Sequence, residues 1–182
     1  MHVMFPGVFH RFDDGRDVHL ASSIDGESWR WVPGGEVVER GQLGSWCGGD
    51  LNPGYGLVPL NQDRIALPVM GYSLPHKFPR GGDEPLGSMG WATWKRGRIS
   101  AIVADQSGGF STPLLTFQGS SLSLNLKTRR SGQVLVEIRD ELDVPISGFA
   151  FHDADPIAAD SLDHLVTWNG RSDLTHLSDR PV

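Results

Sequence analysis

Apolar side chains recur at every second residue in short runs, and this period constrains the fold more than any other feature of the chain. The run Gln133–Arg139 shows it best, because Val134, Val136 and Ile138 would share one face of an extended strand. We find little helical periodicity. The 23 glycines and 12 prolines are scattered between such runs, as expected when turns separate many short strands. The sequence therefore predicts an all-β protein.

The predicted strands fall into two groups, divided by a change of composition near Asp105–Gly109. Five of the six tryptophans precede this point, and aliphatic runs dominate after it. We therefore expect one domain over residues 1–104 and a second over residues 105–182. The predicted strands are Val3–Phe9, Val18–Ser22, Gly56–Leu60, Arg64–Gly71, Gly87–Trp94, Ile99–Val103, Pro113–Phe117, Leu122–Leu126, Gln133–Arg139, Ile146–Phe151 and His164–Trp168.

Glycine and proline also predict particular turns. Asp13-Asp14-Gly15, Ile24-Asp25-Gly26 and Asn169-Gly170 are typical of hairpin turns in which glycine adopts a positive φ. The proline at position 68 predicts an edge strand or a bulge, because proline cannot donate to a sheet ladder. The polar segment Pro75–Pro85 is expected to be a long loop.

Charge and cysteine content exclude several classes of protein. The net charge of −6 argues against binding to nucleic acid or to an anionic membrane surface, since both require a basic face. A single cysteine, Cys47, permits no intrachain disulfide and no thiolate zinc cluster. Asp13-Asp14 and Asp153-Ala154-Asp155 supply too few oxygen ligands for calcium and are better interpreted as turns. We expect no cofactor or metal. Because no signal peptide or membrane span is evident, we expect a cytoplasmic protein.

The segment from Ser23 to Trp29 contains an Asp-box-like pattern, in which serine is followed by Asp25-Gly26 and then tryptophan. The motif order continues with Gly44-Ser45-Trp46-Cys47, Gly90-Trp91-Ala92-Thr93, Gly109-Phe110-Ser111-Thr112-Pro113 and Val136-Glu137-Ile138-Arg139-Asp140. This order resembles bacterial proteins similar to glycoside hydrolase families 32 and 43, and the resemblance covers essentially the whole chain. It implies a β-propeller followed by a β-sandwich.

The chain departs from that family in ways that affect function. Only about two four-stranded blades, at about 40–50 residues each, fit before the sandwich, whereas the family has five. Cys47 stands where the family usually has a carboxylate. The chain ends before the last sandwich strand of the relatives. We therefore expect a partial propeller and a sandwich lacking its last strand, with open sheet edges that pair into a homo-oligomer.

The resemblance implies a carbohydrate ligand, and the residues suggest where it would bind. Asp50, in a glycine-rich loop beside Trp46, and Glu36 are the candidate catalytic carboxylates, although a turn-capping aspartate and a solvated glutamate are the simpler interpretations. Trp46 is the best candidate for stacking on a sugar. The other candidate ligand-binding residues are His10, Arg11 and His76, and Glu84 could join His76 in a lid. Cys47 is a weaker candidate nucleophile and is better interpreted as a small apolar residue.

These features support two hypotheses of different class. The first is a glycoside hydrolase fragment that acts through Asp50 and a second acid. The alternative is a non-catalytic module that binds carbohydrate or mediates oligomerisation. A third interpretation is an inert remnant of a longer gene.

Overall fold

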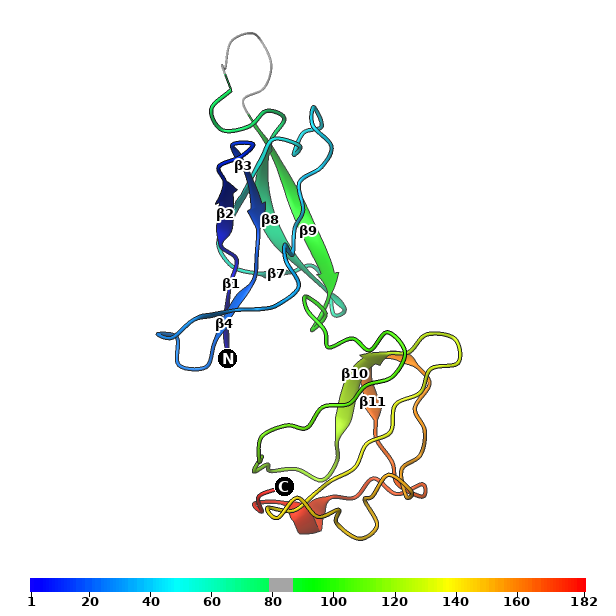
Figure 1. The fold of residues 1–182 in the computed structure, drawn as a ribbon. Helices are drawn as coiled ribbons and strands as arrows, with labels where there is room; N and C mark the ends of the chain where they lie inside the picture. The colour runs from blue at the N-terminus through cyan, green and yellow to red at the C-terminus, as the bar shows by residue number, and fades with distance from the viewer. Residues whose placement is uncertain (79–86) are drawn as a thin grey trace. The chain divides into compact units, whose positions relative to one another are not determined.

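The computed structural model describes residues 1–78 and 87–182 and divides the chain into two compact units, Met1–Ile102 and Val103–Val182 (Figure 1). Strands dominate both units. Within the described residues the only helix is the single 3-10 turn η1 (Thr175–Leu177), and no helix there is long and apolar enough to cross a membrane. The all-β prediction is confirmed. The assignment of the units to propeller blades and a sandwich stays a prediction.

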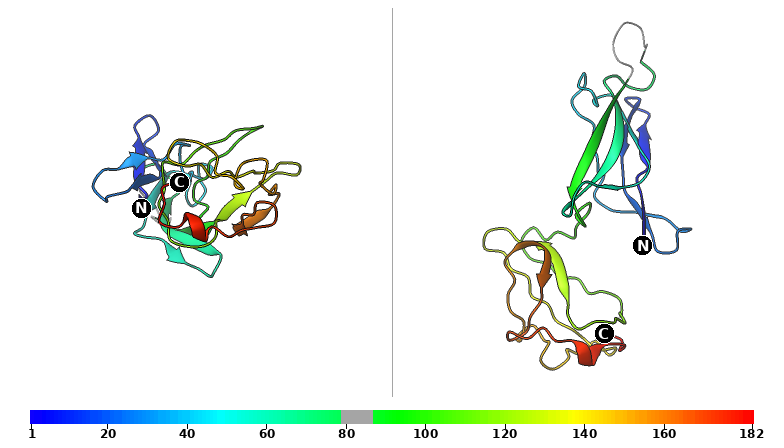
Figure 2. Two further views of the ribbon diagram at one scale, coloured as in Figure 1. Left: turned by 90° about the horizontal axis from the view of Figure 1, so that it is seen from below. Right: turned by 180° about the vertical axis from the view of Figure 1, so that it is seen from behind.

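Unit 1 consists of short antiparallel sheets. One sheet has the order β1-β4-β5, β2 and β3 form a hairpin, and β8 carries β9 on one side and both β6 and β7 on the other. β8 and β9 lie side by side along their length in Figures 1 and 2. The strands are β1 (His2–Met4), β2 (Gly7–His10), β3 (Gly15–Val18), β4 (Ala21–Ser23), β5 (Arg30–Trp31), β6 (Asp50–Pro53), β7 (Val58–Pro59), β8 (Arg64–Tyr72) and β9 (Ser88–Lys95).

The core of unit 1 lies on one face of the β8 sheet. Leu51, Leu67 and Val69 are almost completely buried there and pack with Val18 of β3. Val18 also exchanges backbone hydrogen bonds of 3.1 Å with Val38, in the segment that follows β5. This contact holds the segment containing Glu36 and Arg40 beside β3, where the candidate site forms.

The prediction that Pro68 marks an edge or a bulge is wrong, because β8 is paired on both sides. β9 pairs with β8 along its length, while β7 pairs with Ala66 and Ile65 and β6 with Val69–Tyr72. Pro68 therefore lies in the gap between two partner strands. Its carbonyl accepts a 2.7 Å hydrogen bond from the N–H of Gly54 in that gap, where the missing proline N–H leaves no strand partner unsatisfied.

The hairpin between β4 and β5 has the geometry that the Asp-box pattern predicts. Asp25 Oδ1 accepts hydrogen bonds from the N–H groups of Glu27 and Ser28 at 2.9 and 2.8 Å, and from the Ser23 hydroxyl at 2.9 Å. Gly26 takes a φ of 81°, and the Trp29 indole N–H donates to its carbonyl at 3.2 Å. The pattern therefore specifies a self-contained turn.

At the β2–β3 turn the expected positive φ falls on a different residue. Asp14, rather than Gly15, adopts the left-handed conformation, with a φ of 53°. Gly15 is required for another reason, because a side chain there would overlap the guanidinium of Arg40. The Asn169-Gly170 turn does have positive φ at both positions, as expected for this hairpin type.

Unit 2 has fewer regular strands than the sequence predicts. Only β10 (Ser123–Lys127) and β11 (Asp160–Leu165) form a ladder. Trp168 is fully buried at the centre of an apolar core with Phe149 and Leu177. The predictions of strands at Ile99–Val103, Pro113–Phe117, Gln133–Arg139 and Ile146–Phe151 are wrong.

Alternation in unit 2 nevertheless marks the side chains that face the core. Val134, Val136 and Ile138 all pack against it, but the backbone around them forms only isolated bridges and single bonds. The Val136 carbonyl, for example, accepts a 2.8 Å bond from the Trp168 indole N–H instead of from a neighbouring strand. Period-two burial therefore does not by itself produce a continuous sheet.

The hydrogen bonds to Asp25 give a pH-dependent prediction. The N–H groups of Ser28 and Glu27, and then the Ser23 hydroxyl, lower the pKa of Asp25 from 3.8 to about 2. Because folding lowers this pKa, the ionised carboxylate stabilises the hairpin above pH 3.8, and the stabilisation is lost as pH falls through about 2. We expect an NMR titration of the Asp25 carboxyl to show the low midpoint, and Ser23→Ala to raise it.

Ser28→Ala is the matched control for this titration. It removes a hydroxyl but keeps the backbone N–H that binds Asp25, so the midpoint should not move. A wild-type Asp25 midpoint near 3.8, or an equal change in both variants, would show that the turn does not hold the carboxylate as described.

Candidate functional site

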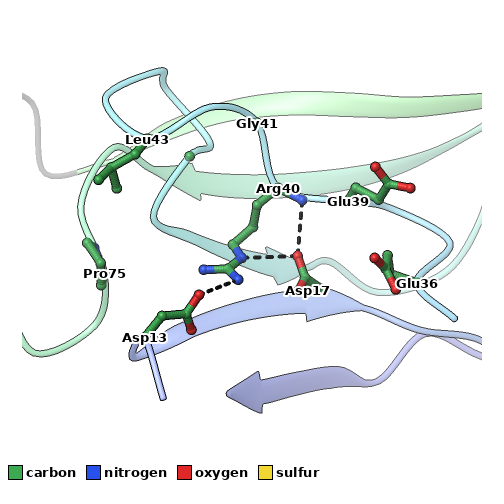
Figure 3. Close-up of a pocket in the computed structure, with 9 residues that line it drawn as sticks. Asp13, Asp17, Glu36, Glu39, Arg40, Gly41, Leu43 and Pro75 are labelled. Atoms are coloured by element: carbon green, nitrogen blue, oxygen red, sulfur yellow. Dashed lines mark hydrogen bonds and ion pairs between the residues drawn. The ribbon is translucent and has the colours of Figure 1, made fainter. Parts of the chain in front are cut away.

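The main candidate site is an open groove of about 490 Å³ in unit 1 (Figure 3). It lies beside β3, between the β2–β3 turn and the segment that connects β5 to β6. Four of its side chains are acidic and one is basic. The lining residues are Asp13, Asp17, Glu36, Glu39, Arg40, Gly41, Leu43, Gly48 and Pro75.

Arg40 organises the groove by binding two carboxylates at once. Its Nη2 lies 2.7 Å from Asp13 Oδ2, and its Nε lies 3.1 Å from Asp17 Oδ1. The backbone N–H of Arg40 donates to the same Asp17 oxygen at 3.0 Å. Figure 3 shows the guanidinium between the two carboxylates, and a Cβ at Gly15 would overlap this guanidinium. The absence of a Cβ at Gly15 therefore makes room for the charged group that fixes this network.

His10 extends the network from β2. The β2–β3 register places His10 opposite Gly15, so its side chain lies diagonally across from Asp17 on the same face of the hairpin. His10 Nε2 lies 2.8 Å from Asp17 Oδ2. Both Asp17 oxygens are therefore engaged, and Asp17 is only 8% exposed. His10, one of the predicted ligand-binding residues, thus contacts Asp17 but does not itself line the groove.

The electrostatics around Arg40 favour the ionised form of Asp13. Burial alone would raise the pKa of Asp13, but the hydrogen bonds from Arg40 and from the Gly15 N–H, with the charge of Arg40, lower it below its usual range. Burial likewise opposes the charge on Arg40, yet Asp13 and Asp17 raise its pKa. Asp13 is therefore a hydrogen-bond acceptor at neutral pH and is unsuited to donate a proton.

Asp50, the first candidate catalytic carboxylate, is not among the groove residues. It lies on β6 and is only 1% exposed. Arg16 Nε lies 3.6 Å from Asp50 Oδ1, and the Asn52 amide donates to Oδ2 at 3.4 Å. Arg16 also donates to Asn52, which completes a partly buried polar cluster around the buried Asp50. In this conformation a substrate could not reach the Asp50 carboxylate.

Glu36, the second candidate carboxylate, does line the groove, together with Glu39. The sequence analysis did not select Glu39, Asp17 or Arg40. Asp17 could have been predicted as a partner of His10, because it lies two residues after Gly15, which is opposite His10 in the hairpin. Nothing in the sequence indicates that Arg40 would contact residues 23 and 27 positions earlier.

Trp46, the predicted sugar platform, lies against the β8 and β9 strands and is 44% exposed. A Cβ built at Gly71 would lie 2.7 Å from its ring, and one at Gly90 would overlap the ring. The indole therefore packs directly on the backbone of these two glycines. Trp46 does not line the groove, so it cannot be the aromatic partner of Glu36 there.

The remaining candidates lie around the β2–β3 turn. His76 donates its backbone N–H to the Asp14 carbonyl at 2.8 Å, and its ring packs edge-on against Phe9. Arg11 is exposed. Neither of these two side chains is among those lining the groove. Glu84 lies outside the described residues.

Residues 1–78 and 87–182 contain no group of three or more His, Cys, Asp or Glu side chains that could hold a metal ion. Comparisons of the chain with protein-family models, with curated proteins and with solved structures found no match. The chemistry of the groove residues is therefore the basis for assigning a function.

The network around Arg40 should also stabilise the fold. Arg40→Ala would leave Asp13 and Asp17 without their cation, so we expect a loss of about 2 kcal/mol in the free energy of unfolding. Arg11→Ala, at an exposed arginine, should cost less than about 0.5 kcal/mol. Urea denaturation measures both values. Equal effects of the two substitutions would contradict the structural role of the Arg40 network.

The packing of Trp46 on Gly71 and Gly90 gives a second prediction. Gly90→Ala would push a methyl group into the indole, and we expect a cost of about 1–3 kcal/mol together with a changed near-ultraviolet circular dichroism signal. Gly109→Ala is the control, because no atom lies within 4 Å of the added carbon. If Gly90→Ala alters neither the stability nor the spectrum, the indole of Trp46 does not pack against Gly90 as described.

Proposed function

We propose that unit 1 binds a carbohydrate in the acidic groove and does not hydrolyse it. The observation that carries this proposal is that the carboxylates of Glu36 and Glu39 line a groove whose wall is held in place by the contacts of Arg40 with Asp13 and Asp17. Sugar hydroxyls are hydrogen-bond donors, and ionised carboxylates accept strong hydrogen bonds from them. Holding the carboxylates in place before binding reduces the entropy lost when a ligand binds.

The groove also has the mixed character of small-molecule sites. Leu43 and Pro75 add apolar surface beside the charged groups, and sugar rings have apolar faces of C–H groups that pack on such surface. The open shape of the groove suits one end or one face of a glycan chain better than an enclosed monosaccharide. A cytoplasmic location is part of this proposal and agrees with the single free cysteine.

Hydrolysis is the second candidate, and one observation favours it. Glu36 and Glu39 line the same groove, and glycosidases need two carboxyl groups near the scissile bond, about 5–9.5 Å apart. Against it, Asp13 and Asp17 are held by Arg40, and Asp50 is enclosed. The groove thus lacks an obvious acid to protonate a leaving group, which is why binding is the better-supported function.

A glycan panel titrated by calorimetry tests the proposal. We expect at least one glycan to bind, and Glu36→Gln or Glu39→Gln to weaken that binding about tenfold, because an amide oxygen accepts hydrogen bonds less strongly than a carboxylate. Glu27→Gln is the control, since Glu27 lies in the Asp-box turn and does not line the groove.

Aryl glycosides assayed in parallel distinguish the two candidates. Binding without turnover supports the binding module. Turnover that is lost in Glu36→Gln would replace it with the hydrolase. The absence of binding to any member of the panel, or equal weakening by Glu27→Gln, would remove the groove from consideration.

A further inference from the structure

The Asn169-Gly170 turn of unit 2 contains the only Asn-Gly pair in the sequence. Both residues are exposed, and their φ values of 50° and 74° lie in the left-handed region. Two backbone hydrogen bonds, of 2.8 and 3.0 Å, join the flanking residues Trp168 and Arg171. Because Trp168 is fully buried at the centre of the core, this exposed turn is anchored directly to the core of unit 2.

An asparagine that precedes a glycine is chemically labile, because glycine has no side chain to shield its backbone nitrogen. In deamidation, a base from the solvent removes the Gly170 backbone proton, and the nitrogen attacks Cγ of Asn169. The new N–Cγ bond closes a succinimide ring, while the Cγ–Nδ2 bond breaks and ammonia leaves. Water then opens the ring to aspartate or isoaspartate, without oxidation or reduction. The reaction therefore needs a free Gly170 N–H and an Asn169 side chain that can turn towards it.

The structure binds both reacting groups to carboxylates of another segment. The Gly170 N–H donates to Asp155 Oδ2 at 2.8 Å. The Asn169 side-chain Nδ2 donates to Asp153 Oδ1 at 3.0 Å, and the Asn169 backbone N–H donates to the Asp153 carbonyl at 2.8 Å. In the folded turn, the attacking nitrogen and the leaving amide are thus bound to two separate carboxylates, and both bonds must break before the ring can close.

The two carboxylates are themselves held in place. Asp155 Oδ2 also accepts a 2.6 Å hydrogen bond from the Thr167 hydroxyl, and Asp153 Oδ2 accepts one of 3.3 Å from the Ala150 N–H. The hydrogen bonds from Thr167 and Gly170 lower the pKa of Asp155 below its usual range. Its carboxylate is therefore a weak base, which holds the Gly170 proton and does not remove it.

We propose that Asn169 is a site of spontaneous deamidation, and that Asp153 and Asp155 restrict the reaction to molecules in which this turn has opened. Such local opening precedes attack because the folded turn keeps the Gly170 nitrogen and the Asn169 amide on their carboxylate partners. The product does not fit the folded turn, since an aspartate at position 169 would place a carboxylate against Asp153, where an amide N–H now donates. Deamidation therefore converts a local opening of unit 2 into a lasting destabilisation.

Peptide mapping by mass spectrometry tests the proposal on the full chain kept in a mildly alkaline buffer. A synthetic peptide of residues 166–173 serves as the reference, because it has the same Asn-Gly pair without Asp153 and Asp155. We expect Asn169 to be converted about a hundredfold more slowly in the protein than in the peptide, since each of the two hydrogen bonds to a carboxylate slows the reaction about tenfold.

Two variants release the turn, and a third is the matched control. Asp155→Asn and Asp153→Asn each replace a charged acceptor by an amide, and we expect each to speed the conversion of Asn169 about tenfold over the wild type. Asp163→Asn makes the same change at an exposed residue of β11 that is not a hydrogen-bond partner of this turn in the described structure, so the rate should not change.

Each outcome decides for or against the proposal. Slow hydrogen exchange of the Trp168 indole, which donates to the Val136 carbonyl, shows that unit 2 of a variant has stayed folded. The proposal is overturned if the wild type is converted as fast as the peptide, or if both folded variants are converted no faster than Asp163→Asn. Slower conversion in Asp155→Asn would overturn it too, because Asp155 would then act as the base. If both variants unfold, the comparison of the wild type with the peptide decides.

Discussion

Unit 1 depends on β8 being a central strand in spite of its proline. Pro68 cannot donate a hydrogen bond, and β8 stays paired on both sides only because β6 and β7 leave a gap at that position. From this strand, Leu67 and Val69 project into the core, while Met70 projects to the opposite face of the sheet. One continuous strand thus positions side chains on both faces of the sheet.

Along β6, the face of the sheet that carries Met70 is polar. Asp50 is paired with Tyr72 and Asn52 with Met70, so both polar side chains share the face of Met70. There, Arg16 contacts the two of them. A buried carboxylate is costly unless it has a cation and hydrogen bonds nearby, and the Arg16 cluster provides these. The role of Asp50 in this structure is therefore to fasten β6 to β3.

The sequence predicted local structure well where the decisive contacts are local. The Asp-box turn is held by bonds among residues only two or three positions apart, so its residue types are sufficient to specify it. The structure places Glu36 in the lining of the groove and His10 against Asp17, while their roles as site residues stay predictions. Alternation also identified the core-facing side chains of unit 2, such as Val136.

Contacts between distant segments were not predictable in the same way. Pro68 was placed on an edge because the gap between β6 and β7 has no signature in the sequence. Unit 2 shows the converse limit: alternation selects a face for each side chain, but a ladder also needs a neighbouring strand in register. Arg40 combines both difficulties, since its carboxylate partners lie on another hairpin and its place depends on the missing Cβ of Gly15.

The position of Arg40 also distinguishes what the groove can do chemically. A general acid near neutral pH needs a carboxyl group whose pKa is raised, usually by burial without a cation. Around Arg40 the opposite holds, because hydrogen bonds and the guanidinium charge outweigh burial and lower the pKa of Asp13. Both oxygens of Asp17 are also occupied, by Arg40 and His10, so Asp17 is not free to exchange a proton with a substrate. These contacts support our proposal that the groove binds a ligand by accepting hydrogen bonds and does not donate a proton to it.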